Sequence, residues 1–101
     1  MAFAITTTNI RLDGSILRGT CKNGKGVPVR SRLDLNLGIG NNNGKFNIFG
    51  TNFTSTARDI YLKDDTLYAT LCTSSGIWTQ ATINLNLCVK NENGELKFEK
   101  Q

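Results

Sequence analysis

The chain has 101 residues, of which 39% are hydrophobic and 20% charged, with a net charge of +4, three cysteines and no histidine. This length suits one ordinary domain, and no apolar run approaches the ~18 residues that indicate a membrane span. Without histidine, Ser-His-Asp and Cys-His catalysis are excluded, and without Cys-x-x-Cys spacing no zinc site is predicted.

The first half of the chain predicts three short strands. Residues 10–12 alternate apolar and polar side chains, and a turn at Asp13-Gly14 separates them from a second strand over 16–21. The Gly-rich stretch 22–26 predicts a hairpin loop, and a third strand follows over 27–33. Pro28 cannot donate to a β-ladder, so we expect that strand to lie at a sheet edge or to be irregular there.

Two tighter elements complete this half. The run Leu33-Asp34-Leu35-Asn36-Leu37 predicts one helical turn, which Asp34 is suited to cap. The dipeptide Asn43-Gly44 predicts a tight hairpin, because a type I′ turn needs positive φ at both central residues. Residues 45–48 alternate on the far side of that turn.

The second half repeats this order fifty residues later. Strands are predicted over 60–62, 67–72 and 77–83, with a turn at Asp64-Asp65, a polar loop over 73–76, a helical turn over 83–87 and a hairpin turn at Asn93-Gly94. An ungapped shift aligns Leu35-Asn36-Leu37 with Leu85-Asn86-Leu87. Such self-similarity indicates a duplicated unit, and because each half is too small to bury a core alone, we expect a shared core. Its predicted members include Phe3, Phe46, Ile48, Phe53, Trp78, Leu96 and Phe98.

A family resemblance rests on residues spread over the whole chain: 14–17, 20–21, 33–36, 41–44, 52–53, 83–85, 91–94 and 96–99. In this order and spacing they resemble the cyanovirin-N homologues, a family of small mannose-binding lectins. The resemblance implies a single all-β, pseudo-symmetric domain of repeats 1–50 and 51–101. Each repeat would form a three-stranded sheet plus a β-hairpin exchanged with the other repeat, with short helical turns. One pseudo-domain would hold about residues 1–38 with 89–101, and the other about 39–88.

The chain departs from the family's disulfide pattern. Cys21 stands at a half-cystine position whose partner position holds Thr7, and the second repeat has Ala57 and Leu71 at the equivalent positions. The chain therefore resembles a disulfide-free branch found in fungi. An odd cysteine count and the lack of a visible signal peptide favour a cytoplasmic protein. Gly50 replaces a proline at the hinge between repeats, which favours a monomer.

The resemblance implies one sugar pocket at the far end of each pseudo-domain, and the function expected is non-catalytic recognition of α-linked mannose oligosaccharides, free or on glycoproteins, with α1,2 the expected linkage. No cofactor, metal or membrane insertion is expected. Small, uncharged residues would line the pocket within 39–88: Gly40, Asn41, Asn42, Asn43, Thr51, Asn52, Ser55, Thr56, Thr73, Ser74, Ser75 and Gly76. Such donors and acceptors suit sugar hydroxyls. Gly40 and Ser55 stand where the family often has carboxylates, which are stronger acceptors.

The second pocket is expected to be weaker, altered in specificity or silent. Its lining would comprise Ala2, Ile5, Thr6, Lys22, Asn23, Gly24, Asn91, Glu92 and Asn93. Ala2 and Ile5 replace polar residues of the family, and Lys22 offers a donor in place of an acceptor.

A structural interpretation competes with the functional one at several of these positions. Asn43 and Asn93 are explained by turn geometry alone, and Asn41 and Asn91 are suited to cap the hairpins, so for these four we favour a structural role. No strong structural role is predicted for Thr51, Asn52, Ser55, Thr56 and Ser74, for which the two interpretations are balanced. Asn52-Phe53-Thr54 is the only glycosylation sequon in the chain.

Other functions compete with a lectin. Asp64 and Asp65 are adjacent, whereas glycosidase chemistry needs two carboxylates set across a cleft. Residues 1–50 carry seven Lys or Arg against two Asp, which makes a small basic nucleic-acid-binding protein the main alternative. It is disfavoured because those basic residues are not interleaved with aromatic ones. A calcium-binding crystallin-type module is disfavoured because carboxylates are sparse at the Asn-rich turns.

Overall fold

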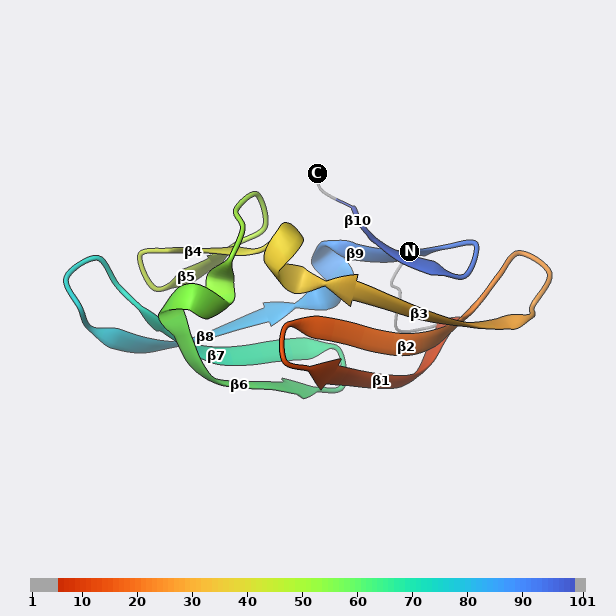
Figure 1. The fold of residues 1–101 in the computed structure, drawn as a ribbon, viewed down its shortest axis with the longest axis horizontal. Coiled ribbons are helices and arrows are strands. Elements are labelled where there is room, and N and C mark those ends of the chain that lie inside the picture. The colour runs from red at the N-terminus through yellow and green to blue at the C-terminus, as the bar shows by residue number, and fades with distance from the viewer. Residues whose placement is uncertain (1–5, 100–101) are drawn as a thin grey trace.

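Two three-stranded antiparallel sheets, one from each repeat, form the body of the molecule (Figure 1). The computed structural model describes residues 6–99. The first sheet comprises β1 (Thr7–Asp13), β2 (Ile16–Lys22) and β3 (Pro28–Asp34), and the second comprises β6 (Ala57–Lys63), β7 (Thr66–Cys72) and β8 (Trp78–Asn84). β3 pairs with β2 alone, so the prediction that Pro28 lies on an edge strand is confirmed.

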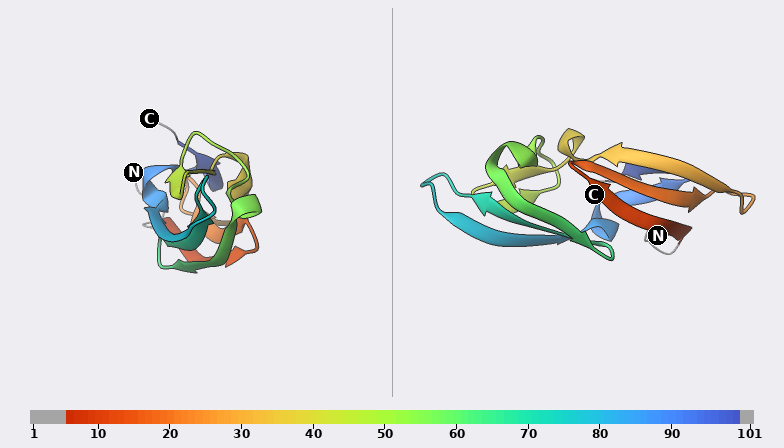
Figure 2. Two further views of the ribbon diagram at one scale, coloured as in Figure 1. Left: turned by 90° about the vertical axis from the view of Figure 1, so that its left-hand side faces the viewer. Right: turned by 60° about the horizontal axis from the view of Figure 1, so that its bottom comes forward.

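The sheets lie end to end and give an elongated molecule of 49 × 24 × 17 Å (Figure 2). The helical elements of the described residues are short 3-10 turns, so the predicted all-β class is confirmed. Within residues 6–99, no helix has the length and apolar character needed to span a membrane.

Both Asn-Gly hairpins form as predicted. β4 (Gly40–Asn42) and β5 (Lys45–Asn47) flank the first, and β9 (Val89–Glu92) and β10 (Glu95–Phe98) flank the second. Asn43 and Gly44 have φ values of 51° and 88°, and Asn93 and Gly94 have 51° and 95°. Positive φ at both central residues is the geometry that a type I′ turn requires.

The 3-10 turns begin at capping side chains. η2 (Leu35–Leu37) follows Asp34, whose Oδ1 accepts a hydrogen bond from the N–H of Asn36 at 3.0 Å. η4 (Leu85–Leu87) follows Asn84, whose Oδ1 accepts from the N–H of Asn86 at 2.9 Å. The prediction that Asp34 caps its turn is therefore confirmed, and Asn84 caps the equivalent turn of the second repeat. A further turn, η3 (Phe53–Thr56), has no counterpart in the predicted elements.

Local details of the first two strands differ from the prediction. The first hairpin loop is Gly14-Ser15, because Asp13 still pairs with Ile16, so the turn lies one residue later than expected. A bulge interrupts the β1–β2 register between Thr8 and Arg11, and the same irregularity recurs in β6. Asn9 and Asp59 take φ of 54° there, a left-handed conformation that Asn and Asp tolerate better than most residues.

Each repeat gives its hairpin to the other. In Figure 1 the β4–β5 hairpin lies over β6–β8, and β9–β10 lies over β1–β3. The N–H of Leu96 in β10 donates to Ser31 Oγ in β3 at 2.9 Å, which fixes one of these contacts. The exchanged-hairpin fold implied by the resemblance is thus the fold observed.

The shared core is built from the inward-facing residues of both repeats. Its fully buried side chains include Leu17, Leu35, Ile39, Phe53, Leu67, Leu85 and Val89. Phe46, half-buried, meets Phe53 edge to face with ring centroids 5.6 Å apart. Leu96 is buried, and Ile48 and Phe98 pack partly buried against the cluster. Phe3, also expected in the core, lies outside the described residues.

The prediction that Trp78 belongs to the core is wrong. Trp78 is 40% exposed, and the guanidinium carbon of Arg58 lies 4.1 Å from the centroid of its indole ring. Trp78 pairs with Cys72 at the end of β7. Ala69 and Leu71 of that strand are buried in the core, and side chains alternate between the two faces of a strand, so Cys72 and its partner Trp78 face outward.

The positions matched to the family's disulfides are cross-strand neighbours. Thr7 pairs with Cys21, and its Oγ1 lies 3.5 Å from Cys21 Sγ. Ala57 pairs with Leu71 at the same place in the second sheet. A hydroxyl–thiol contact and an apolar contact therefore stand at these two positions, and all three cysteines are free.

Candidate functional site

Asn41 fastens the β4–β5 hairpin to the second sheet. Its Oδ1 accepts a hydrogen bond from the N–H of Gly44 at 2.8 Å, which closes the turn. Its Nδ2 donates to the carbonyl of Cys72 and to Thr56 Oγ1, both at 2.8 Å. Both amide hydrogens are engaged in these bonds, so Asn41 positions its neighbours rather than offering donors to a ligand.

Asn91 makes the same three bonds in the other hairpin. It accepts from the N–H of Gly94 and donates to the carbonyl of Lys22, both at 2.8 Å, and donates to Thr6 Oγ1 at 2.9 Å. The prediction that Asn41 and Asn91 cap the hairpins is confirmed. The additional bonds to Cys72 and Lys22 show that each residue also clamps its hairpin to the sheet of the other repeat.

The end of the molecule beyond the second sheet, termed the end of the second repeat, brings together the tip of the β4–β5 hairpin and the β7–β8 loop. Asn43 Oδ1 accepts two hydrogen bonds from Ser74, from its N–H at 2.9 Å and its Oγ at 3.0 Å. Thr73 Oγ1 accepts from the N–H of Ile77 at 3.1 Å and lies 3.1 Å from Ser75 Oγ. The structure thus joins Asn43, Thr73, Ser74 and Ser75 into one uncharged polar surface.

Free polar groups remain on this surface. Asn42 and Asn43 are exposed, and neither the Asn42 side chain nor the Asn43 Nδ2 bonds to any residue in the described range. Ser74, Ser75 and Gly76 are exposed as well. These groups can still form hydrogen bonds to a ligand.

A second group of predicted residues lies along η3. Thr56, at its end, is held beside the hairpin by Asn41. Asn52 precedes η3 with φ of 58° and a side chain that makes no capping bond, while its carbonyl accepts from Ser55 Oγ at 2.9 Å. Thr51, Asn52, Ser55 and Thr56 are all exposed.

Gly40 contributes to this region through its lack of a side chain. It is buried, and a Cβ built on it would lie 2.8 Å from the Thr51 nitrogen and 2.9 Å from the Gly50 Cα. Both neighbours are backbone atoms, so a side chain at this position requires the chain to move. The carboxylate that the family resemblance implies at this position would not fit this backbone.

The opposite end of the molecule, termed the end of the first repeat, is formed by the first sheet and the β9–β10 hairpin and is partly charged. Asn93 Oδ1 accepts from the N–H of Gly24 at 2.7 Å, and Asn23 Oδ1 accepts from the N–H of Lys25 at 2.9 Å and of Val27 at 3.0 Å. Lys22 and Glu92 are exposed on the same elements. Ala2 and Ile5, also assigned to this surface, lie outside the described residues.

A hollow of about 720 Å³ lies elsewhere, between the two sheets, and its lining includes Ile10, Leu12, Ile60 and Leu62. None of the predicted sugar-binding residues that the structure describes lines it. The candidate surfaces are therefore at the two ends of the molecule and not at this central groove.

Residues 3–97 match the profile of the family described as the CVNH domain. The chain belongs to the cyanovirin-N homologue (CVNH) family. A designed cyanovirin-N homologue lectin, LKAMG, is 38% identical, with 98% of this chain and 100% of that chain covered and a TM-score of 0.92. GzCVNH from Gibberella zeae is 39% identical, with 95% of each chain covered and a TM-score of 0.87. A comparison with curated protein sequences gave no match.

Two further similar structures contain sugars. A variant of MoCVNH3, 27% identical with 96% of each chain covered and a TM-score of 0.88, was solved with (N-GlcNAc)4. Microvirin, 26% identical with 98% of this chain and 100% of that chain covered and a TM-score of 0.84, was solved with mannobiose. The predicted family is confirmed, and similar solved structures include fungal members. The three cysteines of this chain are free, and the family is one of lectins rather than enzymes.

One positioning residue of this CVNH chain has no counterpart among the predicted site residues. Asn36 Nδ2 donates to Thr54 Oγ1 at 2.7 Å, and Asn36 Oδ1 accepts from the N–H of Thr54 at 3.2 Å. The carbonyl of Asn36 accepts from the N–H of Asn52 at 2.8 Å. Asn36 therefore holds η3 and its polar residues in place. The repetition of this asparagine at position 86 was the available signal.

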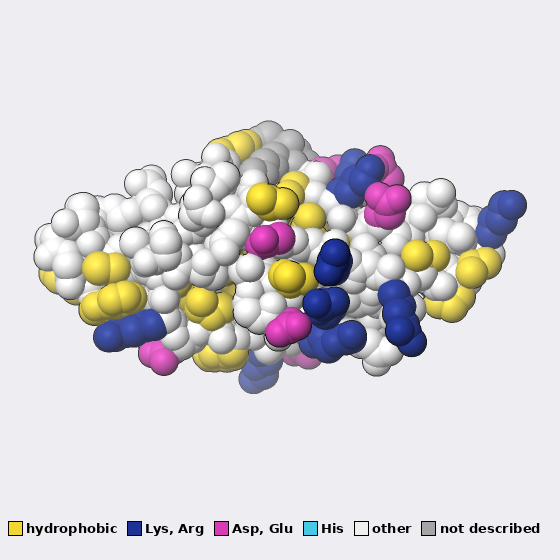
Figure 3. Space-filling view, viewed as in Figure 1, with side chains coloured by type: hydrophobic (Ala, Val, Ile, Leu, Met, Phe, Trp, Pro, Cys, Tyr) yellow, Lys and Arg dark blue, Asp and Glu magenta, His cyan; other side chains and the backbone are white. Residues whose placement is uncertain are grey.

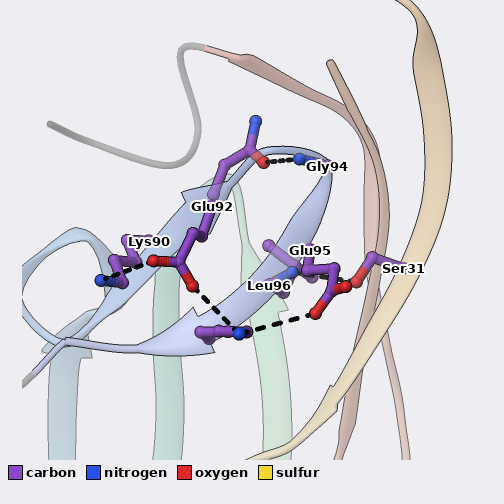
Figure 4. A network of polar contacts seen from close by, with 8 residues as sticks. Ser31, Lys90, Glu92, Gly94, Glu95 and Leu96 are labelled. Atoms are coloured by element: carbon purple, nitrogen blue, oxygen red, sulfur yellow. Dashed lines mark hydrogen bonds and ion pairs between the residues drawn. The ribbon is translucent and has the colours of Figure 1, made fainter. Parts of the chain in front are cut away.

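Glu92, in the other candidate surface, belongs to an ion-pair network (Figure 4). Its carboxylate lies 3.0 Å from Lys97 Nζ and 3.6 Å from Lys90 Nζ, and Lys97 also lies 3.7 Å from Glu95. The hydrogen bond from Lys97, together with the charges of Lys90 and Lys97, lowers the pKa of Glu92 below its ordinary value. The bond to Glu92 in turn raises the pKa of Lys97.

We expect Lys97→Met to raise the pKa of Glu92 toward its ordinary value, as measured by NMR titration of the side-chain carboxyl. Because the folded-state pKa lies below the unfolded one, the network stabilises the fold above the unfolded pKa. That contribution is lost as the pH falls through the folded-state pKa. Lys25→Met removes an exposed charge elsewhere and is the control. An ordinary Glu92 pKa in the unmodified protein, or an equal change in both variants, contradicts the network.

Proposed function

We propose that this CVNH lectin binds α-linked mannose oligosaccharides, with α1,2 as the preferred linkage, through the surface at the end of the second repeat. The observation that carries the proposal is the pair of bonds from Ser74 to Asn43, which fixes two segments of different repeats into one uncharged polar surface. The free amide of Asn43, the Asn42 side chain and nearby hydroxyls would pair with sugar hydroxyls. The mannobiose bound to microvirin supports a mannose ligand.

The end of the first repeat is the weaker candidate. Its Glu92 carboxylate is engaged by Lys90 and Lys97, and Lys22 adds a positive charge, so fewer neutral acceptors remain for hydroxyls. We propose that neutral sugars bind there more weakly or not at all.

Asn42→Ala is expected to weaken binding of an α1,2-linked mannobiose about fivefold, which corresponds to one hydrogen bond worth about 1 kcal/mol. Lys22→Ala, which alters the other end, is expected to leave the affinity unchanged. Titration by isothermal calorimetry measures both. Both side chains are exposed, so neither change is expected to disturb the fold.

An amide-resolved NMR titration with the same disaccharide tests the location independently. We expect the shifts to be confined to residues 40–43, 51–56 and 73–76. Shifts at 22–24 and 91–93 instead would transfer the proposal to the other end. No binding at millimolar mannobiose contradicts the mannose ligand, and a response to (N-GlcNAc)4 alone would make N-acetylglucosamine the preferred sugar.

We further propose that the protein functions as a monomer in a reducing compartment, the cytoplasm. Cys21 and Cys88 are buried, Cys72 is half-buried, and all three are free, which supports a setting where thiols act as small apolar side chains. Sedimentation equilibrium of the reduced protein tests the monomer.

A further inference from the structure

The outer face of the first sheet carries four arginines. Arg11, Arg18 and Arg32 are directly opposite one another across β1, β2 and β3, and Arg30 lies two residues before Arg32 on the same face. Figure 3 shows a cluster of Lys and Arg side chains over this half of the molecule. Neighbouring strands are about 4.8 Å apart, so the backbones of Arg11, Arg18 and Arg32 follow one another at roughly that interval.

These arginines line a shallow hollow of about 680 Å³. The uncharged polar residues Asn9 and Thr20 also line it, whereas Ser31 Oγ is already bonded to the N–H of Leu96. Among residues 6–99, no aromatic side chain lines the hollow. Its rim includes Leu96 and one carboxylate, Glu95, which lies 3.7 Å from Lys97.

Little negative charge balances this face. Asp13, with a side chain 72% exposed, lies 3.4 Å from Arg18 Nε, and Arg11 Nη1 donates to the carbonyl of Asn9 at 3.0 Å. Among residues 6–99, Arg11, Arg30 and Arg32 have no ion pair within 4.0 Å. Like charges directly opposite on a sheet destabilise it, so this arrangement works against the free protein.

The second repeat shows that the fold does not require these charges. The same face of the second sheet has Tyr61 and Tyr68 in place of Arg11 and Arg18, and Gln80 and Thr82 in place of Arg30 and Arg32. The two tyrosine rings stack with centroids 4.7 Å apart. The strand register is the same in both sheets, so only the chemistry of the face has changed.

We propose that this arginine face, formed by Arg11, Arg18, Arg30 and Arg32, binds an acidic polysaccharide, a sugar chain bearing sulfate, phosphate or carboxylate groups. Guanidinium groups form paired, charge-assisted hydrogen bonds with such anions, and the hydroxyl and amide groups between them match sugar hydroxyls. A single-stranded nucleic acid is less well matched, because its bases need aromatic side chains on which to stack. The proposal does not rest on the mannose surface, which lies at the end of the other repeat.

The test uses dextran sulfate as the acidic probe and unsulfated dextran as its neutral match. The double variant Arg30→Gln with Arg32→Thr copies the residues that stand at the matching register positions of the second sheet. Lys45→Gln with Lys63→Gln removes the same charge from exposed positions outside the face. Nuclear magnetic resonance spectra of both variants verify the fold.

We expect the protein to bind dextran sulfate and not dextran. The arginine variant should lose about tenfold or more in affinity, and the lysine variant about twofold or less. The slope of log affinity against log salt should fall by about 1 to 2 in the arginine variant, because two charged contacts are removed. Its affinity for α1,2-mannobiose should not change, which separates this surface from the proposed mannose site.

Three outcomes overturn the proposal. If the protein does not bind dextran sulfate at physiological salt, the arginine face is not a site for acidic polysaccharides. If the arginine and lysine variants lose affinity for dextran sulfate equally, binding depends on the net charge of the protein and not on the arginine face. Binding of poly(U) as tight as that of dextran sulfate, with the same loss in the arginine variant, identifies a nucleic-acid surface instead.

Discussion

Phe53→Ala is expected to lower the free energy of unfolding by about 3–5 kcal/mol, the usual cost of removing a buried aromatic ring. The ring is fully buried and meets Phe46 edge to face, and the N–H of Phe53 donates to the carbonyl of Ile39 at 3.1 Å. The substitution removes side-chain packing between the repeats and leaves a cavity that the two sheets cannot close without moving. Urea unfolding followed by tryptophan fluorescence and by far-ultraviolet circular dichroism measures the loss.

Phe49→Ala is the matched control, because Phe49 is 63% exposed in the same segment of the chain. Its effect should stay within about 0.5 kcal/mol. Both probes should report one coincident transition, since a core shared by both repeats couples their unfolding. Equal losses in the two variants, or two separate transitions, would show that Phe53 does not join the repeats.

The sequence predicts the local elements well where one residue type decides the backbone. Asn43-Gly44 is such a case, because few other dipeptides adopt positive φ twice, and Asp34 is another, because its carboxylate satisfies the first free N–H of a turn. The prediction for Trp78 is wrong because large apolar residues are expected in the core, whereas its pairing with Cys72 directs its side chain to the outer face. Side chains alternate between the two faces of a strand, so the buried position of Leu71 places Cys72, and with it Trp78, on the outer face.

The exchange of hairpins is beyond any local rule. Nothing in residues 40–47 specifies that they pack on the sheet of the following repeat; that arrangement was implied by the family resemblance. The third bond of Asn41 illustrates why. A turn cap can be predicted from residues three positions apart, but the acceptor, the carbonyl of Cys72, is 31 residues away and only the fold brings it near.

Asn41→Ala is expected to cost about 2–3 kcal/mol of stability, because it leaves the Gly44 N–H and the Cys72 carbonyl without their partners in a half-buried site. It should also weaken α1,2-mannobiose binding about tenfold, although Asn41 itself has no donor left for the sugar. The reason is preorganisation: the clamp holds the hairpin that carries Asn42 and Asn43, and a loosened hairpin must be ordered again on binding. Chemical denaturation and calorimetry measure the two effects.

Asn91→Ala separates these two roles, because Asn91 makes the same three bonds in the other hairpin. A similar loss of stability is expected, since the same kinds of groups lose their partners. Mannobiose binding should be unchanged if the sugar occupies only the end of the second repeat. Equal weakening of binding by both substitutions would place functional sugar sites at both ends. Weakening by Asn91→Ala alone would place the site at the end of the first repeat, where Glu92 and its lysines would then have to accommodate it.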